Sequence, residues 1–199
     1  MLNVKTRQKF LKNLGFYKDK IDGIVGPNTI KAYKKLQTKY FPKKYVDGIY
    51  GIQTETLLRN AERVRLYCKN FKLEEFKCEC GGKYCTGYPV LLSVQLLKNT
   101  QKVRTHHGYA MYVTSGLRCN KLNNSLVGSI RGSKHTKGKA IDFYTSKTGS
   151  VSNRKKIINY YIKLLSANYS YCNGYTRTKW KKGTMSAPYM GTSIHIDVT

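Results

Sequence analysis

Apolar side chains recur at helical spacing in the first third of the chain. Residues 27–40 and 52–67 each carry them three or four positions apart, as one buried helix face requires. These positions are Ile30, Tyr33, Leu36 and Tyr40, followed by Leu57, Leu58, Ala61 and Val64. Residues 4–17, "VKTRQKFLKNLGFY", supply one more amphipathic stretch. The pattern predicts an all-α three-helix bundle at the N-terminus.

A short repeat precedes the second and third of these stretches. Residues 22–29, "DGIVGPNT", and 47–54, "DGIYGIQT", share the pattern D-G-I-x-G-x-x-T and are 25 residues apart. Asp-Gly favours a tight turn, and Pro27 suits the first turn of a helix. The repeat therefore predicts two glycine turns, each leading into a helix.

Beyond residue 66 the pattern changes to short strands between loops. The segments 109–115, 139–144 and 193–198 are rich in β-branched and aromatic side chains, which is typical of strands. Helices are expected from about Tyr88 and within 153–169. We therefore predict a second, α+β domain, with the chain divided into residues 1–66 and 67–199.

Charge narrows the choice of partners. The formal net charge is +27, and no apolar run is long enough for a membrane span. Such a charge predicts attraction to anionic polymers, including those of cell walls. The basic residues are spread along the whole chain, so no nucleic-acid partner is expected. The first 17 residues lack the apolar core of a signal peptide, which predicts synthesis in the host cytoplasm and delivery by another route to the bacterial cell wall, where the protein would act.

Six cysteines leave two interpretations open. They are Cys68, Cys78, Cys80, Cys85, Cys119 and Cys172. The run "CECGGKYC" at 78–85 supplies three ligands of a structural zinc site, with the fourth to come from one of the remaining cysteines. Because the spacing is not that of paired C-x-x-C turns, free or loosely paired thiols are the favoured interpretation.

Carboxylates are scarce in the C-terminal part, where Asp142 and Asp197 are the only two after residue 80. Asp142 lies in the apolar strand "AIDFY", so it needs a cationic partner such as a metal ion or an arginine. His195 and Asp197 are two residues apart, on one face of a strand. Together with His135 they indicate a metal site, and two imidazoles with one carboxylate are the ligand count of a catalytic zinc.

The repeat and helices of residues 3–64 resemble the peptidoglycan-binding domain, type one, which is attached to many bacterial and phage wall hydrolases. This resemblance implies binding to bacterial peptidoglycan. The glycines of the repeat shape the turns of that fold, and they need not contact a ligand.

The second part resembles a family of zinc peptidases. The pattern H-x-x-G-x-A-x-D from His135 to Asp142, the later H-x-D, "TSGLR" upstream and "FKLEEFKCECG" at 71–81 are similar to D-alanyl-D-alanine carboxypeptidases and L-alanyl-D-glutamate endopeptidases. The resemblance implies the hedgehog/DD-peptidase fold and a Zn²⁺ cofactor. It also implies that His135, Asp142 and His195 are the zinc ligands.

The same resemblance gives roles to two further residues. Arg118 in "SGLR" matches an arginine that faces the substrate, where a guanidinium would bind a stem-peptide carboxylate or a polarised carbonyl. Relatives carry an acid three residues before the last histidine, but this chain has Thr192. Asp197 is therefore the favoured general base. It could instead orient His195 or bind zinc itself, with the base coming from elsewhere.

These features together predict a monomeric, endolysin-like wall hydrolase that cleaves peptidoglycan stem peptides. Both an L-Ala–D-Glu endopeptidase and a D-Ala–D-Ala carboxypeptidase agree with the sequence. The alternative is a non-catalytic peptidoglycan-binding protein with a structural zinc.

Overall fold

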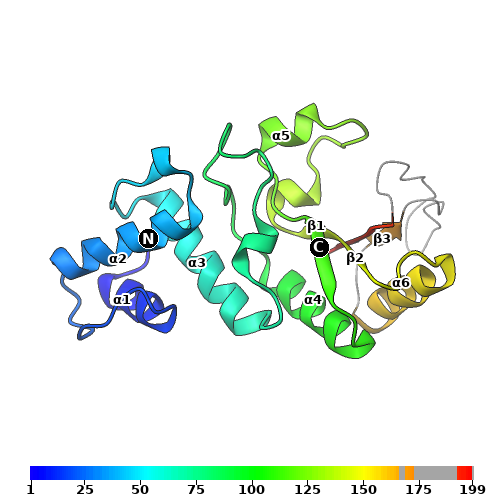
Figure 1. Ribbon diagram of the computed structural model, residues 1–199, viewed down its shortest axis with the longest axis horizontal. Coiled ribbons are helices and arrows are strands. Elements are labelled where there is room, and N and C mark those ends of the chain that lie inside the picture. The colour runs from blue at the N-terminus through cyan, green and yellow to red at the C-terminus, as the bar shows by residue number, and fades with distance from the viewer. Residues whose placement is uncertain (166–168, 173–191, 199) are drawn as a thin grey trace.

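The computed structural model describes residues 1–165, 169–172 and 192–198. Its first part is helical, with α1 (Val4–Asn13), α2 (Pro27–Tyr40), the 3-10 helix η1 (Lys43–Tyr45) and α3 (Ile52–Tyr67). The predicted second and third helices have the expected bounds. The first ends earlier than expected, because Leu14 caps it and Gly15 takes a positive φ of 80°. Figure 1 shows α1, α2 and α3 together at one end of the molecule.

The predicted buried faces of these helices are correct except at one position. Tyr33, Leu36 and the whole apolar set of α3 are buried, whereas Ile30 is 47% exposed. Ile30 instead lies near Gly48 in the second glycine turn, where its side chain would be 3.6 Å from an added Cβ. Helical spacing identified the face, and Ile30 lies at its edge.

Each glycine turn is held by a buried glutamine that the repeat did not reveal. Gln37 donates from Nε2 to Asp47 Oδ1 at 2.7 Å and to Thr54 Oγ1 at 2.9 Å, and its Oε1 accepts from Gly48 N at 2.7 Å. Gln8 makes the corresponding bonds to the first copy of the repeat, including one from Gly23 N. Gly23 and Gly48 have positive φ values of 86° and 77°, a conformation that glycine adopts without steric cost. The repeated Asp and Thr are therefore structural.

Replacing Gln37 with alanine is expected to lower the free energy of unfolding by about 2–4 kcal/mol. The substitution leaves several buried polar groups without a partner, and each costs about 1–3 kcal/mol. Urea denaturation followed by circular dichroism measures the loss. Gln53→Ala, at an exposed position of α3, is the matched control and should change stability by less than about 0.5 kcal/mol. Equal stabilities for the two variants would contradict this account of the turns.

The second part joins helices to one small antiparallel sheet. The helical elements are η2 (Leu73–Phe76), α4 (Val94–His107), α5 (Asn120–Ser125), η3 (Lys134–Lys137) and α6 (Val151–Leu165). The strands are β1 (Met111–Ser115), β2 (Ala140–Thr145), β3 (Tyr169–Cys172) and β4 (Ile194–Asp197), in the order β1-β2-β4-β3. The α6 helix packs on β3 and β4, and α4 lies between α3 and α6. The expected mixture of helices and strands is therefore present.

The prediction that a helix begins near Tyr88 is wrong. The α4 helix begins at Val94, with Ser93 as its N-cap. The preceding residues are held outside the helix by distant partners: Leu92 N donates to Asn60 Oδ1 at 2.8 Å, and Ser93 N donates to the carbonyl of Gly138 at 2.8 Å. These long-range bonds override the local helical pattern.

The same segment links the two halves of the chain. Asn60, fully buried on α3, also donates to the carbonyl of Val90 at 2.9 Å. On its other side, Leu91 packs so closely against Gly138 that a Cβ there would lie 2.1 Å from the Leu91 carbonyl oxygen. Gly138 is the glycine of the H-x-x-G motif, so residues 90–93 connect α3 of the first helical unit to the loop that carries His135. No helix in the described part of the chain is long and apolar enough to cross a membrane.

Candidate metal centre and active site

Three different elements bring His135, Asp142 and His195 together. Asp142 on β2 lies directly opposite His195 on the antiparallel strand β4. His135 is on the 3-10 turn η3, just before β2. One ligand atom from each residue lies within 4.8 Å of the other two. The structure thus brings together the three residues that the sequence singles out as metal ligands.

The imidazoles face Asp142 with one nitrogen each. His195 Nδ1 is 2.8 Å from Asp142 Oδ1, and His135 Nε2 is 3.3 Å from Asp142 Oδ2. The other ring nitrogen of His135, Nδ1, lies 2.8 Å from the carbonyl oxygen of Gly116. A carbonyl only accepts, so Nδ1 carries the proton and Nε2 offers a lone pair toward the cluster. This arrangement is typical of a metal-binding histidine.

Burial and the neighbouring charged groups shift the pKa values of these side chains in opposite directions. Burial lowers the pKa of His135, which favours the neutral imidazole that binds metals. For His195, burial also opposes the charged form, but hydrogen bonds with Asp142 and Asp197 outweigh it and raise the pKa. Although burial alone would raise the pKa of Asp142, the adjacent His135 and His195 hold it well below its ordinary value. Asp142 is therefore a carboxylate.

Asp197 lies on the far side of His195 from Asp142. Its Oδ2 is 3.3 Å from His195 Nε2, and its Oδ1 is buried without a hydrogen-bond partner among the described residues. The backbone carbonyl of Asp197 accepts from Tyr161 of α6 at 3.1 Å, which fixes this end of β4. Asp197 thus contacts the ring nitrogen of His195 that points away from Asp142.

Arg118 also contacts this centre. Its Nη2 is 2.9 Å from Asp142 Oδ2, and its Nε donates to Ser115 Oγ at 2.8 Å. Gly116, two residues before Arg118, has no room for a side chain, because a Cβ would lie 2.6 Å from the backbone of Phe76. The "SGLR" turn is therefore fixed beneath η2, and Arg118 is held against the metal cluster.

Two features of this centre were missed by the sequence analysis. Ser115 Oγ accepts a hydrogen bond from Arg118, and the Gly116 carbonyl accepts one from His135. Ser115 and Gly116 both belong to the "TSGLR" motif that contains Arg118. Glu79 is a further carboxylate, exposed and close enough for the charges of Arg118 and Asp142 to act on it. Desolvation raises the pKa of Glu79, and Arg118 opposes that effect. The position of Glu79 between two cysteines in the sequence does not indicate that it lies near Arg118 and Asp142.

The residues present suit a zinc ion. Two imidazole nitrogens and one carboxylate oxygen form a three-ligand set, which leaves one position of a tetrahedral zinc for water or substrate. Each histidine has a partner on its second ring nitrogen, namely the Gly116 carbonyl and the Asp197 carboxylate. Partners of this kind fix the ring orientation of metal-binding histidines.

Comparison with known families supports the same interpretation. The peptidase M15 family model matches residues 69–163, a range that includes Arg118, His135 and Asp142. The model of a peptidoglycan binding domain matches residues 2–58. No curated protein gives a significant match to the chain. The chain is therefore a zinc metallopeptidase in which an N-terminal peptidoglycan-binding domain precedes a domain that matches the M15 peptidases.

Proposed function

We propose that this protein is an endolysin-like cell-wall hydrolase that cleaves the stem peptides of bacterial peptidoglycan. The observation that carries the proposal is the convergence of His135, Asp142 and His195 in a peptidase domain. A peptidoglycan-binding domain precedes it and points to a wall substrate. We also propose that residues 1–66 form the peptidoglycan-binding domain and that residues 67–199 form a peptidase domain with the hedgehog/DD-peptidase fold.

In this proposal His135, Asp142 and His195 hold the zinc ion. Zinc supplies Lewis acidity and a nucleophilic water near neutral pH. Arg118, held by Ser115 and Asp142, places a guanidinium beside the zinc ligands. Stem peptides carry carboxylates, and a guanidinium binds a carboxylate through two parallel hydrogen bonds. We therefore assign Arg118 to substrate binding.

Asp197 remains the proposed general base, and its contact with His195 Nε2 supports the alternative role expected from the sequence, in which Asp197 orients His195. Its contact with His195 Nε2 leaves Nδ1 of that ring facing Asp142, as expected if Nδ1 binds zinc. Asp197 would then orient His195, while its Oδ1, which has no hydrogen-bond partner among the described residues, can accept a proton. Glu79 is the other carboxylate near Arg118.

The bond that is cut can be identified with two synthetic stem peptides. One peptide ends in D-Ala–D-Ala, and the other lacks the terminal D-Ala but retains L-Ala–D-Glu. An endopeptidase releases a new D-Glu amino terminus from both peptides. A carboxypeptidase releases free D-Ala from the first peptide alone. If the zinc-loaded protein cleaves neither peptide nor intact peptidoglycan, the proposed function is wrong.

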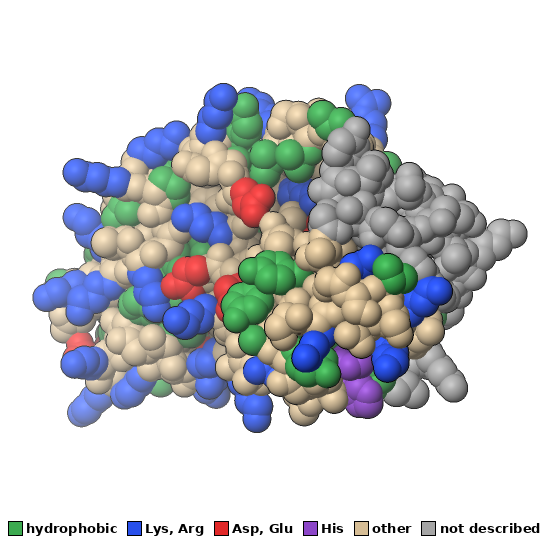
Figure 2. Space-filling model, turned by 45° about the vertical axis from the view of Figure 1, so that its right-hand side comes forward, with side chains coloured by type: hydrophobic (Ala, Val, Ile, Leu, Met, Phe, Trp, Pro, Cys, Tyr) green, Lys and Arg blue, Asp and Glu red, His purple; other side chains and the backbone are tan. Residues whose placement is uncertain are grey.

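The positive charge predicts salt-sensitive wall binding. Lysine and arginine side chains spread over the face shown in Figure 2, with few acidic side chains among them. We propose that anionic wall polymers add to the attraction of peptidoglycan. Sedimentation with purified walls should show binding that falls steeply between about 50 mM and 500 mM salt, where the Debye length shrinks to a few ångströms. Walls stripped of anionic polymer are the control, and salt-independent binding to intact walls would contradict the electrostatic contribution.

A further inference from the structure

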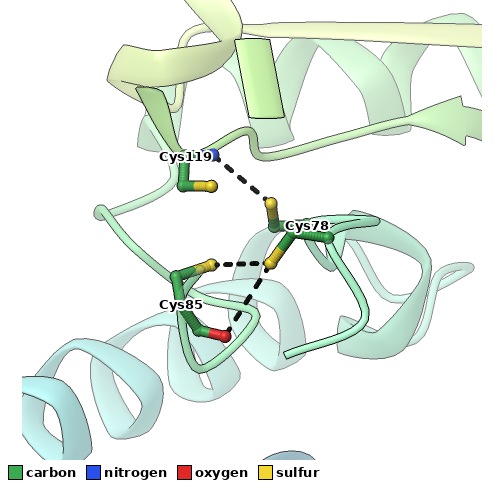
Figure 3. Close-up of side chains that lie close together, drawn as sticks. Cys78, Cys85 and Cys119 are labelled. Atoms are coloured by element: carbon green, nitrogen blue, oxygen red, sulfur yellow. Dashed lines mark hydrogen bonds between the residues drawn. The ribbon is translucent and has the colours of Figure 1, made fainter. Parts of the chain in front are cut away.

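A second cluster of metal-binding side chains lies outside the proposed catalytic centre. Cys78, Cys80 and Cys85 are in the segment between η2 and α4, and Cys119 is the N-cap of α5. The four sulfur atoms all lie within 4.8 Å of one another. Figure 3 shows Cys85 and Cys119 approaching from opposite sides, with Cys78 between them. Residues separated by more than thirty positions in sequence therefore meet at one point.

Backbone amides are directed at three of these sulfur atoms. Cys119 N donates to Cys78 Sγ at 3.3 Å, Gly87 N to Cys85 Sγ at 3.4 Å, and Leu122 N to Cys119 Sγ at 3.5 Å. Such hydrogen bonds favour the thiolate over the thiol, because they stabilise negative charge on sulfur. They also recur around metal-bound thiolates, whose properties they tune. The backbone is thus arranged for anionic sulfur.

The loop is shaped to bring the sulfurs together without disulfides. Gly81 and Gly82 take positive φ values of 61° and 83°, which turn the chain back between Cys80 and Cys85. Gly87, whose amide donates to Cys85 Sγ, follows with a positive φ of 100°. The Sγ atoms of Cys80 and Cys85 are 3.4 Å apart, far beyond the bond length of about 2.05 Å. All four cysteines of the cluster are free thiols. A separation near 3.4 Å is instead compatible with two sulfurs that share one metal ion.

We propose that Cys78, Cys80, Cys85 and Cys119 bind a structural zinc ion, distinct from the zinc of the catalytic centre. Four thiolates complete a tetrahedral zinc and leave no open position, as in closed structural sites. Four thiolates around one Zn²⁺ carry a net negative charge. Lys83 and Lys121 both lie over the ring of Tyr84, beside Cys85, so cations from the loop and from α5 are near enough to offset it.

The structural zinc would also support the catalytic centre. Cys119 directly follows Arg118, whose guanidinium contacts Asp142. Leu117 N donates to the carbonyl of Phe76 at 2.9 Å, two residues before Cys78. A zinc ion bound by Cys78 and Cys119 therefore holds together the two segments that the bond between Leu117 and Phe76 joins. It would hold Arg118 in place without touching the substrate.

Metal analysis of the full-length protein tests the proposal. Protein produced under reducing conditions with zinc should contain two zinc ions per chain. Cys85→Ser and Cys119→Ser should each reduce that number to one. Cys68→Ala removes a buried cysteine that lies outside the cluster, and it should retain both ions. Cysteine-cluster variants with the zinc content of the wild type would overturn the proposal.

Cobalt substitution gives an independent result for the unaltered protein. Cobalt-loaded wild type should show intense thiolate-to-cobalt charge transfer and tetrahedral ligand-field bands. His195→Ala should keep these bands, because it alters only the catalytic centre. If a cysteine variant fails to fold, the wild-type spectrum still decides the question. A single bound metal without charge transfer, or a mass spectrum with the four cysteines in disulfides under reducing purification, would contradict the structural zinc.

Discussion

Replacing His195 with alanine is expected to abolish peptide hydrolysis while wall binding is kept. His195 is 6% exposed and contacts both Asp142 and Asp197, so its loss removes one proposed zinc ligand and a neighbour of two buried carboxylates. A metal ion contributes several kcal/mol to stabilising the transition state, and each 1.4 kcal/mol is tenfold in rate. We expect kcat/KM to fall by at least about 1,000-fold. Hydrolysis of a stem peptide measures the loss.

Two measurements separate a lost zinc ligand from a lost fold. His195→Ala should still sediment with purified walls, because the peptidoglycan-binding domain spans residues 2–58. His106→Ala, at an exposed histidine that stacks on Tyr160 with ring centres 3.7 Å apart, is the matched histidine control and should keep its activity. Hydrolysis by His195→Ala at the wild-type rate would remove His195 from the catalytic site.

The second large effect is expected at Asp197, where two substitutions distinguish its possible roles. If Asp197 orients His195, Asp197→Ala should weaken zinc binding by about 10–100-fold. Asp197→Asn should restore most of that affinity, because an amide oxygen still accepts a hydrogen bond from the N–H of His195 Nε2. If Asp197 is the general base, both variants should lose about 100- to 10,000-fold in kcat even when saturated with zinc. Zinc titration and kcat at saturating zinc measure the two roles separately.

Glu79→Gln completes this comparison. A zinc-saturated Asp197→Asn variant with nearly full activity would exclude Asp197 as the base. A loss in Glu79→Gln of the size expected for a base would then assign the proton transfer to Glu79. Full activity and unchanged zinc affinity in both Asp197 variants would contradict both roles of Asp197.

The sequence predicted those parts of the structure that depend on local pattern. Three- and four-residue spacing placed α2 and α3, because a helix face is set by its own residues. Strand alternation placed His195 and Asp197 on one face of β4. The scarcity of acids identified Asp142 as a residue that needed a cation, and it contacts Arg118 and two histidines.

What the sequence did not predict depends on contacts between distant segments. The start of α4 is set by Asn60, which lies 32 residues before its partner Leu92, and by Gly138, which lies 45 residues after its partner Ser93. Gln8 and Gln37 hold the glycine turns from outside the repeated motif. Cys119 could not be chosen as the fourth member of the cysteine cluster, because only the fold places the start of α5 beside residues 78–85. Local spacing carries no information about these approaches.

Mass spectrometry of purified peptidoglycan tests the central claim most directly. The digest would compare zinc-loaded protein, the same protein after chelation, and chelated protein reloaded with zinc. The account predicts new amino termini within stem peptides, or loss of terminal D-Ala, with the zinc-loaded and reloaded protein only. A wall profile that zinc-loaded protein leaves unchanged across several wall types would contradict the assignment as a peptidoglycan peptidase.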